Sequence, residues 1–381
     1  MSRSIVHMDL DTFFVSCERV VNSQLNGIPL IIGGSSDRGV VASCSYEART
    51  FGVRSAMPMK MALRLCPQAK VIRGDMELYS KYSHTVTEII NDKAPVVEKA
   101  SIDEFYIDVS GMDKFFGCFK WTKELSQTVT KETGLPISFG LSINKTVSKI
   151  ATGESKPMGR IEIAEKMVKP FLNPLSIKKI PMVGDVTFQL LSRLGIRKIH
   201  TLSEMPIEML QKLIGKNGRE LWKKANGIDE NPVEPYTERK SVSTEQTFDQ
   251  DTIDIPRMKA MLTAMVEKLG FQLRNEEWLA SIVTVKIKYN NFDTETKQFK
   301  IPYTSCDHIL LKRVLELFDN LYERRMRLRL IGISFRGLVH GAYQIDMFDD
   351  TKEMINLYQA LDKIKRRYGI NSVKRCVGMD I

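Results

Sequence analysis

The segment Ala100-Ser101-Ile102-Asp103-Glu104-Phe105-Tyr106-Ile107-Asp108-Val109 places two adjacent carboxylates at the start of a run that alternates between apolar and polar residues. The alternation predicts a half-buried strand, with Phe105, Ile107 and Val109 on one face. An isolated acidic pair before a strand is most often a solvated turn. A functional interpretation therefore needs a second feature in the chain.

A second acidic strand lies near the N-terminus, where Ile5-Val6-His7-Met8 leads into an Asp-Leu-Asp triplet that starts at Asp9. If the two strands are neighbours, they bring Asp9, Asp103 and Glu104 together. Three carboxylates that close repel one another unless a divalent cation compensates them. Hard oxygen ligands favour Mg²⁺, which keeps open positions for water and substrate phosphates. The cluster therefore predicts phosphoryl transfer with two metal ions roughly 3.5–4 Å apart.

Length and charge set the broad class. A chain of 381 residues is long enough for two to four compact units. Its 56 Lys and Arg against 46 Asp and Glu give a net charge of +10, which favours a polyanionic partner, although basic proteins without one are common. The six cysteines form no CxxC pair and indicate reduced thiols in the cytoplasm. Neither a signal peptide nor a membrane-spanning run is expected.

The segment Tyr46-Glu47-Ala48-Arg49 offers a ring and a guanidinium to one ligand. Tyr46 and Arg49 are three residues apart, so they share a face of a helical turn. A guanidinium binds phosphate oxygens bidentately, which makes a triphosphate a natural ligand. The alternative is a local ion pair between Arg49 and Glu47 or Asp37.

Lys156 precedes a Pro-x-Gly turn, from which a side chain can reach back across a cleft. A solvated lysine is the ordinary alternative there. Phe14, after the first acidic strand, has a similar ambiguity, because its position in the apolar pattern is also that of a core aromatic. Neither residue acquires a role from its local pattern alone.

Residues 166 to 240 carry 14 Lys and Arg against 8 Asp and Glu and predict short helices joined by tight turns. Within this span, Ile180-Pro181-Met182-Val183-Gly184 resembles a helix-hairpin-helix, whose backbone amides hold a DNA phosphate without reading sequence. Met182 stands where such hairpins usually carry glycine, which puts the close phosphate approach in question. Lys216-Asn217-Gly218-Arg219 predicts either a second backbone contact or an ordinary helix cap.

The C-terminal part of the chain predicts a separate domain beyond a polar, proline-bearing linker at residues 234 to 240. Its element order is βαββαβ, with strands near 241–248, 281–289, 297–303 and 329–338 and helices near 256–275 and 307–325. In the second strand, Thr284, Lys286 and Lys288 share one face. That face fits a DNA backbone, but lysines on an exposed strand also serve solubility. A basic amphipathic helix is expected over 352–368.

Four motifs, in this order, resemble those of the Y-family of translesion DNA polymerases, most closely its DNA polymerase IV (DinB) branch. They are Asp9-Leu10-Asp11-x-Phe13-Phe14, Tyr46-Glu47-Ala48-Arg49-x-Phe51-Gly52-Val53, Ser101-Ile102-Asp103-Glu104 and Lys156-Pro157-x-Gly159. The likeness runs from about residue 4 to residue 340. It argues strongly against a mere surface turn at Asp103 and Glu104.

The resemblance implies an α+β multidomain fold, a right-hand polymerase with palm, fingers and thumb, followed by a βαββαβ little-finger domain. The expected divisions are palm 1–17 and 76–165, fingers 18–75, thumb 166–233, linker 234–240, little finger 241–340 and C-terminal tail 341–381. Fingers this short imply an open, solvent-accessible site. Loose inspection of base-pair shape, and so low fidelity, is the expectation that follows.

By motif, the resemblance implies that Asp9, Asp103 and Glu104 are the catalytic carboxylates and hold two Mg²⁺ ions. The backbone carbonyl of Leu10 would be a further metal ligand. The triphosphate would be bound by a separate set, which consists of Tyr46, Arg49 and Lys156 with the Ser43 hydroxyl nearby. Phe14 would be the steric gate, because a ring stacked under the sugar leaves no room for a 2′-hydroxyl.

The implied activity is template-directed, low-fidelity DNA synthesis, in which a dNMP is added to a primer 3′-hydroxyl without proofreading. The expected partners are primer–template DNA, a dNTP and a sliding clamp, and the protein is expected to act as a monomer in the cytoplasm. Gln344-Ile345-Asp346-Met347-Phe348 resembles the clamp-binding pentapeptide, with Gln344 and Phe348 as anchors and Ile345 and Met347 as further contacts.

Other functions fit parts of the same pattern. A two-metal nuclease or nucleotidyl cyclase would share the carboxylates, but not the full set of triphosphate and DNA-binding features. Within the family, a UmuC-like polymerase subunit that depends on partner proteins would share all four motifs. A non-catalytic scaffold that binds DNA and the clamp is the alternative outside the enzymes.

Overall fold

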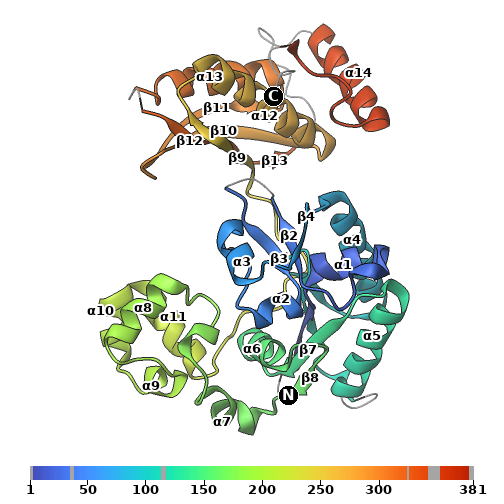
Figure 1. Ribbon diagram of the computed structural model, residues 1–381, viewed down its shortest axis with the longest axis vertical. Helices are drawn as coiled ribbons and strands as arrows, with labels where there is room; N and C mark the ends of the chain where they lie inside the picture. Colours follow the sequence, from blue (N-terminus) through green and yellow to red (C-terminus); the bar gives the residue numbers. More distant parts are fainter. Residues whose placement is uncertain (1–2, 35–37, 113–116, 324–325, 342–351, 377–381) are drawn as a thin grey trace. The chain divides into compact units, whose positions relative to one another are not determined.

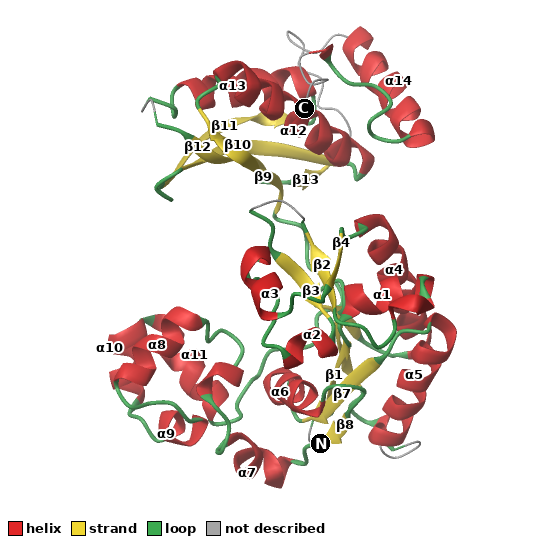
Figure 2. Ribbon diagram, viewed as in Figure 1, coloured by secondary structure: helices red, strands yellow, loops and turns green. Residues whose placement is uncertain are grey.

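The computed structural model describes residues 3–34, 38–112, 117–323, 326–341 and 352–376 of the chain (Figure 1). The chain forms two compact units, Met1–Thr237 and Glu238–Ile381. Both units mix helices and strands (Figure 2). Across the described parts of the chain, no helix is both long enough and apolar enough to cross a membrane.

A five-stranded sheet in the first unit carries both acidic segments. Its spatial order is β5 (Val97–Lys99), β6 (Glu104–Asp108), β1 (Ile5–Leu10), β7 (Ile137–Ser142) and β8 (Arg160–Glu162). Strand β1 pairs antiparallel with β6 on one side and with β7 on the other. The two acidic strands are therefore direct neighbours, as the sequence predicts.

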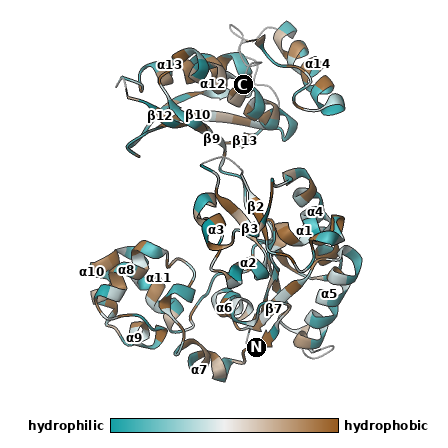
Figure 3. Ribbon diagram, viewed as in Figure 1, coloured by the Kyte–Doolittle hydropathy of each residue, from teal (hydrophilic) through white to brown (hydrophobic). Residues whose placement is uncertain are grey.

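One face of this sheet is apolar and is covered by three helices, α1 (Phe13–Val21), α4 (Met76–Lys93) and α5 (Cys118–Thr133). Met8 from β1 and Phe105 and Ile107 from β6 are fully buried in that core. The predicted alternation of the acidic strand is thus correct, with Glu104 and Asp108 directed to the opposite face. The helices combine hydrophobic and hydrophilic residues, as amphipathic covers do (Figure 3).

Helix α6 (Lys145–Ser155) packs against the other face, over β1 and β7. The approach is close, because a Cβ atom at Gly140 would lie 2.6 Å from the Ser148 carbonyl oxygen. Two hydroxyls on the helix donate to carbonyls of β1, Ser148 to Ile5 at 2.7 Å and Thr152 to His7 at 2.9 Å. These contacts fix the position of α6 along the acidic strand.

The rest of the first unit consists of a small sheet and a group of short helices. The sheet has the order β3 (Val41–Cys44), β2 (Leu30–Gly33), β4 (Lys70–Ile72). The remaining helices are α2 (Tyr46–Thr50), α3 (Met59–Leu65), α7 (Val168–Leu172), α8 (Asp185–Arg193), α9 (Ile199–Ser203), α10 (Ile207–Ile214) and α11 (Lys216–Ala225), with 3₁₀ turns at Ser23–Leu25, Glu165–Met167 and Ile177–Lys179. The boundaries between palm, fingers and thumb stay predictions. The predicted boundary between palm and fingers, at residues 17 and 18, falls inside helix α1.

Two predictions within residues 166 to 240 can be compared with the backbone. Gly218 lies inside α11, where a Cβ atom would come within 2.4 Å of the Leu210 carbonyl oxygen, so it serves helix packing. Met182 has a φ of 86°, a conformation that favours glycine. The hairpin therefore keeps the glycine-like backbone although its sequence carries methionine.

The second unit has the predicted βαββαβ order. Its elements are β9 (Ser241–Thr252), α12 (Ile255–Asn275), β10 (Trp278–Tyr289), β11 (Thr294–Thr304), α13 (Asp307–Asp319) and β12 (Leu328–Arg336), followed by β13 (Val339–His340) and α14 (Lys352–Tyr368). The four long strands form an antiparallel sheet in the order β11-β10-β12-β9. Helices α12 and α13 pack on one face of it.

A buried ion-pair network attaches α14 to this domain. The Arg274 guanidinium on α12 contacts Asp362 on α14 at 2.7 and 3.0 Å and Asp307 on α13 at 2.6 Å. Tyr358 on α14 is also buried, and its hydroxyl lies 2.9 Å from the ring Nδ1 of His308. The predicted helix 352–368 is therefore present, and its buried Tyr358 and Asp362 attach it to α12 and α13.

Candidate active site

The two acidic strands place their carboxylates side by side. Asp9 and Glu104 are directly opposite each other in the β1–β6 register. The Leu10 amide donates to the Asp103 carbonyl at 3.0 Å, so Asp103 borders the same point. The Asp103 carboxylate itself accepts a hydrogen bond from Ser101 at 2.6 Å. The predicted grouping of three carboxylates is therefore present at the level of the backbone.

Crowding and burial show in the electrostatics of Asp9. Burial raises its pKa from an ordinary 3.8 to about 7; the nearby Lys156 ammonium opposes this rise, and the charges of Glu104 and Asp103 add to it. A site that gathers negative charge with too little water to solvate it has a strong affinity for compensating cations. This is the physical property that a metal-dependent site needs.

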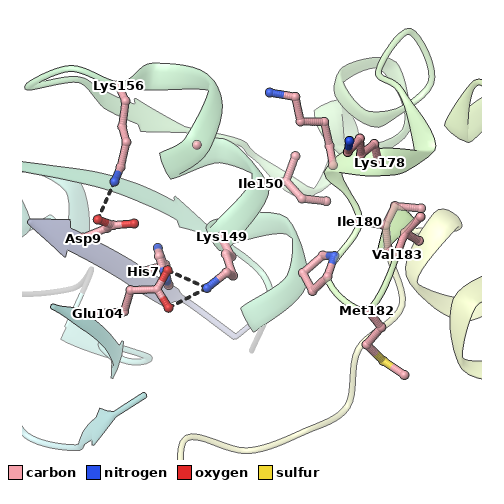
Figure 4. A pocket seen from close by; sticks show the side chains of 14 residues that line it. His7, Asp9, Glu104, Lys149, Ile150, Lys156, Lys178, Ile180, Met182 and Val183 are labelled. Atoms are coloured by element: carbon pink, nitrogen blue, oxygen red, sulfur yellow. Dashed lines mark hydrogen bonds and ion pairs between the residues drawn. The ribbon is translucent and has the colours of Figure 1, made fainter. Parts of the chain in front are cut away.

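Two lysines place positive charge beside the carboxylates (Figure 4). Lys156 contacts Asp9 through its ammonium group, so its side chain reaches across to the acidic strand, which the sequence pattern indicates only as an alternative to a solvated lysine. Lys149 on α6 contacts both carboxylate oxygens of Glu104, at 2.7 and 2.6 Å. Among the residues that the structure describes, no three or more His, Cys, Asp or Glu side chains converge closely enough to hold a metal ion. The side chains would have to turn from their lysines to do so.

The donor set nevertheless fits a hard divalent cation. It consists of the carboxylate oxygens of Asp9, Asp103 and Glu104 and the carbonyl oxygen of Leu10, which are ligand types that Mg²⁺ prefers. This set contains no sulfur or imidazole ligand, although the almost fully buried His7 ring lies nearby, with its Nε2 atom 3.9 Å from a Glu104 oxygen. The residues present are thus compatible with the cation that the sequence predicts.

A cavity of about 170 Å³ adjoins the carboxylates and collects most of the predicted nucleotide-binding residues. It is lined by Asp9, Leu10, Thr12, Phe13, Phe14, Ala42, Ser43, Arg49, Ser55, Asp103 and Lys156. The predicted residues Phe14, Ser43, Arg49 and Lys156 therefore converge, although they come from distant parts of the sequence. Thr12, Ala42 and Ser55 are additions that no local pattern indicated.

Arg49 is poised for an anionic ligand. Its Nε atom is buried and, within the described part of the protein, has no hydrogen-bond partner. Of the two partners in the predicted alternative, Glu47 instead pairs with Arg19 at 2.9 Å, and Asp37 lies outside the described residues. The Arg49 guanidinium lies 5.1 Å from the centre of the Tyr46 ring, so the two side chains share a face as predicted. Tyr46 itself donates to Asp11 at 3.3 Å, outside the cavity lining.

Phe14 is held by a second ring that sequence reasoning missed. It stacks on Tyr79 of α4, with ring centres 4.4 Å apart and planes 14° apart. Tyr79 is fully buried, and its hydroxyl donates to Glu18 at 2.6 Å. In sequence, Tyr79 is one aromatic on an amphipathic helix, which ordinarily indicates core packing. Its position fixes the plane of the Phe14 ring at the wall of the cavity.

A buried histidine lies under the acidic pair. The His7 ring is almost fully buried, and its Nδ1 atom lies 3.0 Å from the Thr152 hydroxyl oxygen. Its Nε2 atom is 3.9 Å from a Glu104 oxygen. Burial, followed by the charges of Lys149 and Lys156, lowers the pKa of His7 well below its ordinary value. The ring is therefore neutral and adds no charge to the site.

A larger cleft of about 540 Å³ opens on the other side of the carboxylates (Figure 4). Asp9, Glu104 and Lys149 form one wall, and residues 178 to 184, which include the predicted hairpin 180–184, form the other. Lys178 and Lys179 lie in the 3₁₀ turn just before that hairpin, and Met182 in the hairpin is more than half exposed. A cleft with lysines on one wall and carboxylates on the other suits a polyanion that ends at the acidic cluster.

Comparison with known proteins agrees with this geometry. Residues 8–153 match the model of the impB/mucB/samB family, and residues 239–347 match that family's C-terminal domain. A relative from Dehalococcoides mccartyi (strain CBDB1), named DNA polymerase IV, is 35% identical over 98% of this chain and 96% of its own length. A protein of the same name from Exiguobacterium sibiricum is 36% identical over 88% of this chain and 94% of its own length.

The fold also has a counterpart among solved structures. The Y-family DNA polymerase chimera Dbh-Dpo4(243-245)-Dbh is similar with a TM-score of 0.78 and 28% identity, over 89% of this chain and 100% of that chain. Fold and site together define a Y-family DNA polymerase, a right-hand enzyme with palm, fingers, thumb and little finger. Within that class, the chain belongs to the DNA polymerase IV family of translesion DNA polymerases.

The stacked pair predicts how sugar selection responds to mutation. Phe14→Ala should admit ribonucleotides, lowering discrimination against rNTPs by about a hundredfold, or roughly 3 kcal/mol. Tyr79→Leu should act in the same direction but more weakly, because it loosens the ring without removing it. Single-nucleotide primer extension with dNTPs and rNTPs measures both. Tyr79→Phe keeps the stack and is the control; an unchanged sugar preference in Phe14→Ala would place the gate elsewhere.

The raised pKa of Asp9 predicts a pH-dependent stability in metal-free buffer. The folded state keeps the Asp9 proton that the unfolded state loses above about pH 4. The resulting contribution to the free energy of unfolding is therefore fully present below about pH 4 and is lost as the pH rises through 7. Relative to Asp9→Asn, the wild type should lose a few kcal/mol over that range, since one pKa unit corresponds to about 1.4 kcal/mol. Urea unfolding in EDTA measures the difference, and parallel stability curves would contradict it. Asp108→Asn, on the neighbouring strand, is the control.

Proposed function

We propose that this polymerase adds a dNMP to a primer 3′-hydroxyl through Asp9, Asp103 and Glu104, with two Mg²⁺ ions per site. The observation that carries the proposal is the register of Asp9 opposite Glu104, with Asp9 also lining the 170 Å³ cavity. When bound, such ions activate the attacking oxygen and stabilise the leaving oxygen. Leu10 lines the same cavity, and its backbone carbonyl oxygen would complete the proposed ligand set.

The chain's own side chains then orient the nucleotide. Arg49 and Lys156 line the cavity and would bind triphosphate oxygens, with Tyr46 beside the Arg49 guanidinium. Ser43 lines the same cavity, and its hydroxyl group would accept or donate a further hydrogen bond. Phe14 would stack under the sugar and exclude a 2′-hydroxyl. Because these groups are positioned before the substrate arrives, most of their effect on the reaction rate would come from orientation and charge.

Primer–template DNA would be held through its backbone. The lysine-bearing cleft beside the carboxylates fits the primer end, and the open face of the β10 sheet fits duplex DNA. On that face Lys286 is partly neutralised by Glu245, at 2.8 and 2.9 Å, whereas Lys288 lies two residues further along the strand. Such contacts bind any sequence and weaken as salt rises. Short fingers would leave the shape of the nascent base pair loosely checked, which supports low fidelity. The sequence contains no segment that resembles a proofreading exonuclease, which supports synthesis without proofreading.

The alternatives are less well supported. A UmuC-like subunit or a non-catalytic scaffold would share the fold, but the relatives that match nearly the whole chain are named DNA polymerase IV. The acidic cluster and the cavity beside it are both intact, which a scaffold does not need. An autonomous polymerase therefore accounts for more of the described site.

Removing one carboxylate tests the assignment. Asp103→Ala should reduce Mg²⁺-dependent nucleotide addition by about a thousandfold or more, since metal stabilisation of the transition state is worth several kcal/mol. Binding of primed DNA should change little, because Asp103 is not among the residues that line the cleft proposed for the primer end. Primer extension and fluorescence anisotropy measure the two properties. Asp108→Ala, on the same strand but away from the cluster, should stay active; retained synthesis in Asp103→Ala would refute the site.

The clamp assignment is a separate part of the proposal. The pentapeptide Gln344-Ile345-Asp346-Met347-Phe348 lies outside the described residues, so its support is the sequence and its place after the little finger. Gln344 and Phe348 would anchor it to a sliding clamp, with Ile345 and Met347 as further contacts. We also infer that the enzyme acts as a monomer, in the cytoplasm, where DNA, dNTPs and the clamp meet.

A double substitution addresses the clamp directly. Gln344→Ala with Phe348→Ala should weaken clamp binding by at least about tenfold, because the two anchors of a short peptide carry most of its binding energy. Surface plasmon resonance with a bacterial sliding clamp measures the affinity. Primer extension without the clamp should stay at the wild-type rate, and an unchanged affinity would exclude the pentapeptide as the docking site.

A further inference from the structure

Lys149 is the one lysine of α6 that reaches the acidic cluster. Its ammonium group contacts both Glu104 oxygens, at 2.7 and 2.6 Å, and both side chains are only partly exposed. One turn earlier on α6, Lys145 makes an equivalent two-oxygen contact with Glu98, at 2.6 Å to each. The helix thus carries two similar ion pairs, of which only one involves a predicted metal ligand.

The position of Lys149 does not depend on its own ion pair. Helix α6 is held on the sheet by the close approach at Gly140 and by the Ser148 and Thr152 hydroxyls, which bond to β1 carbonyls. Lys149 projects from the same stretch of helix, next to the strand that carries Asp9. Its ammonium group is therefore presented to Glu104 by backbone contacts that a change of side chain leaves in place.

Lys149 also differs from the other lysine of the cluster. Lys156 lines the 170 Å³ nucleotide cavity, where a triphosphate can attract it away from Asp9. Lys149 lines the 540 Å³ cleft and is not part of the nucleotide-cavity lining. Nucleotide binding therefore gives Lys149 no alternative partner, and its charge stays beside Glu104.

We propose that Lys149 is a positioning residue that orients Glu104 and acts as its fixed counter-cation, so that a divalent cation binds the carboxylates in competition with the ammonium group. This inference rests on the proposed metal-dependent function of Asp9, Asp103 and Glu104. The reason is Coulombic: two positive charges that approach the same carboxylate repel each other, and the effect is strong where water is partly excluded. Lys149 thereby keeps the cation affinity of the DNA-free enzyme low.

The test is Mn²⁺ binding to the full-length protein without DNA or nucleotide, followed by the electron paramagnetic resonance signal of free Mn²⁺. Lys149→Met should bind Mn²⁺ about threefold to tenfold more tightly than the wild type. Lys149→Arg keeps the charge and should remain close to the wild type. A variant that was merely misfolded or loosened would not gain affinity, and circular dichroism checks the fold. Lys149→Gln provides a second neutral variant.

Lys145→Met is the matched control, because it removes the same charge from the same helix but next to Glu98. An unchanged or weaker Mn²⁺ affinity in Lys149→Met, or an equal gain in Lys145→Met, would overturn the inference. Glu104→Gln separates the inference from the proposed function. If it weakens Mn²⁺ binding while Lys149→Met equals the wild type, only the counter-cation role fails. If wild-type binding is not reduced by Glu104→Gln, the metal site fails and the inference fails with it.

Discussion

Burial of neighbouring carboxylates on adjacent strands, with their mutual repulsion added to it, is the constraint on which the site depends. In the antiparallel register Asp9 lies opposite Glu104, so both side chains project from the same face of the sheet and are both partly shielded from water. Water alone does not solvate such a pair well, so the protein supplies ammonium groups from Lys149 and Lys156. The neutral ring of His7 fills the space below without adding charge. The same surplus of negative charge makes the site receptive to cations.

Helix α6 connects the packing of the sheet to the position of a side chain in the site. The helix comes close to β7 because Gly140 has no side chain, and its hydroxyls bond to carbonyls of the acidic strand. A small change in this approach would move Lys149 relative to Glu104 by a similar amount. On the opposite face, the ring of Phe14 is set by the buried Tyr79 in the same way. Core packing on both faces of the sheet therefore determines how precisely the site is built.

Much of this arrangement could be predicted from the sequence, because motif residues and alternating strands are local signals. The acidic strands, the βαββαβ domain and the convergence of Arg49 and Lys156 follow from such signals together with the family resemblance. Lys149 and Tyr79 could not be found in this way, because a lysine or an aromatic on an amphipathic helix has the pattern of a solvated or core position. Their partners lie on other elements, and only the three-dimensional register reveals them.

The ion-pair network of α14 determines where the C-terminal domain can be cut if it is transferred to another polymerase. Arg274 is satisfied by Asp307 within the βαββαβ fold and by Asp362 from beyond it. A graft that ended near residue 340 would keep the Asp307 contact of the Arg274 guanidinium but lose both of its Asp362 contacts, which a buried charge tolerates poorly. A domain exchange between polymerases should therefore include α14 and end after it. The N-terminal boundary of such an exchange is the linker at residues 234 to 240.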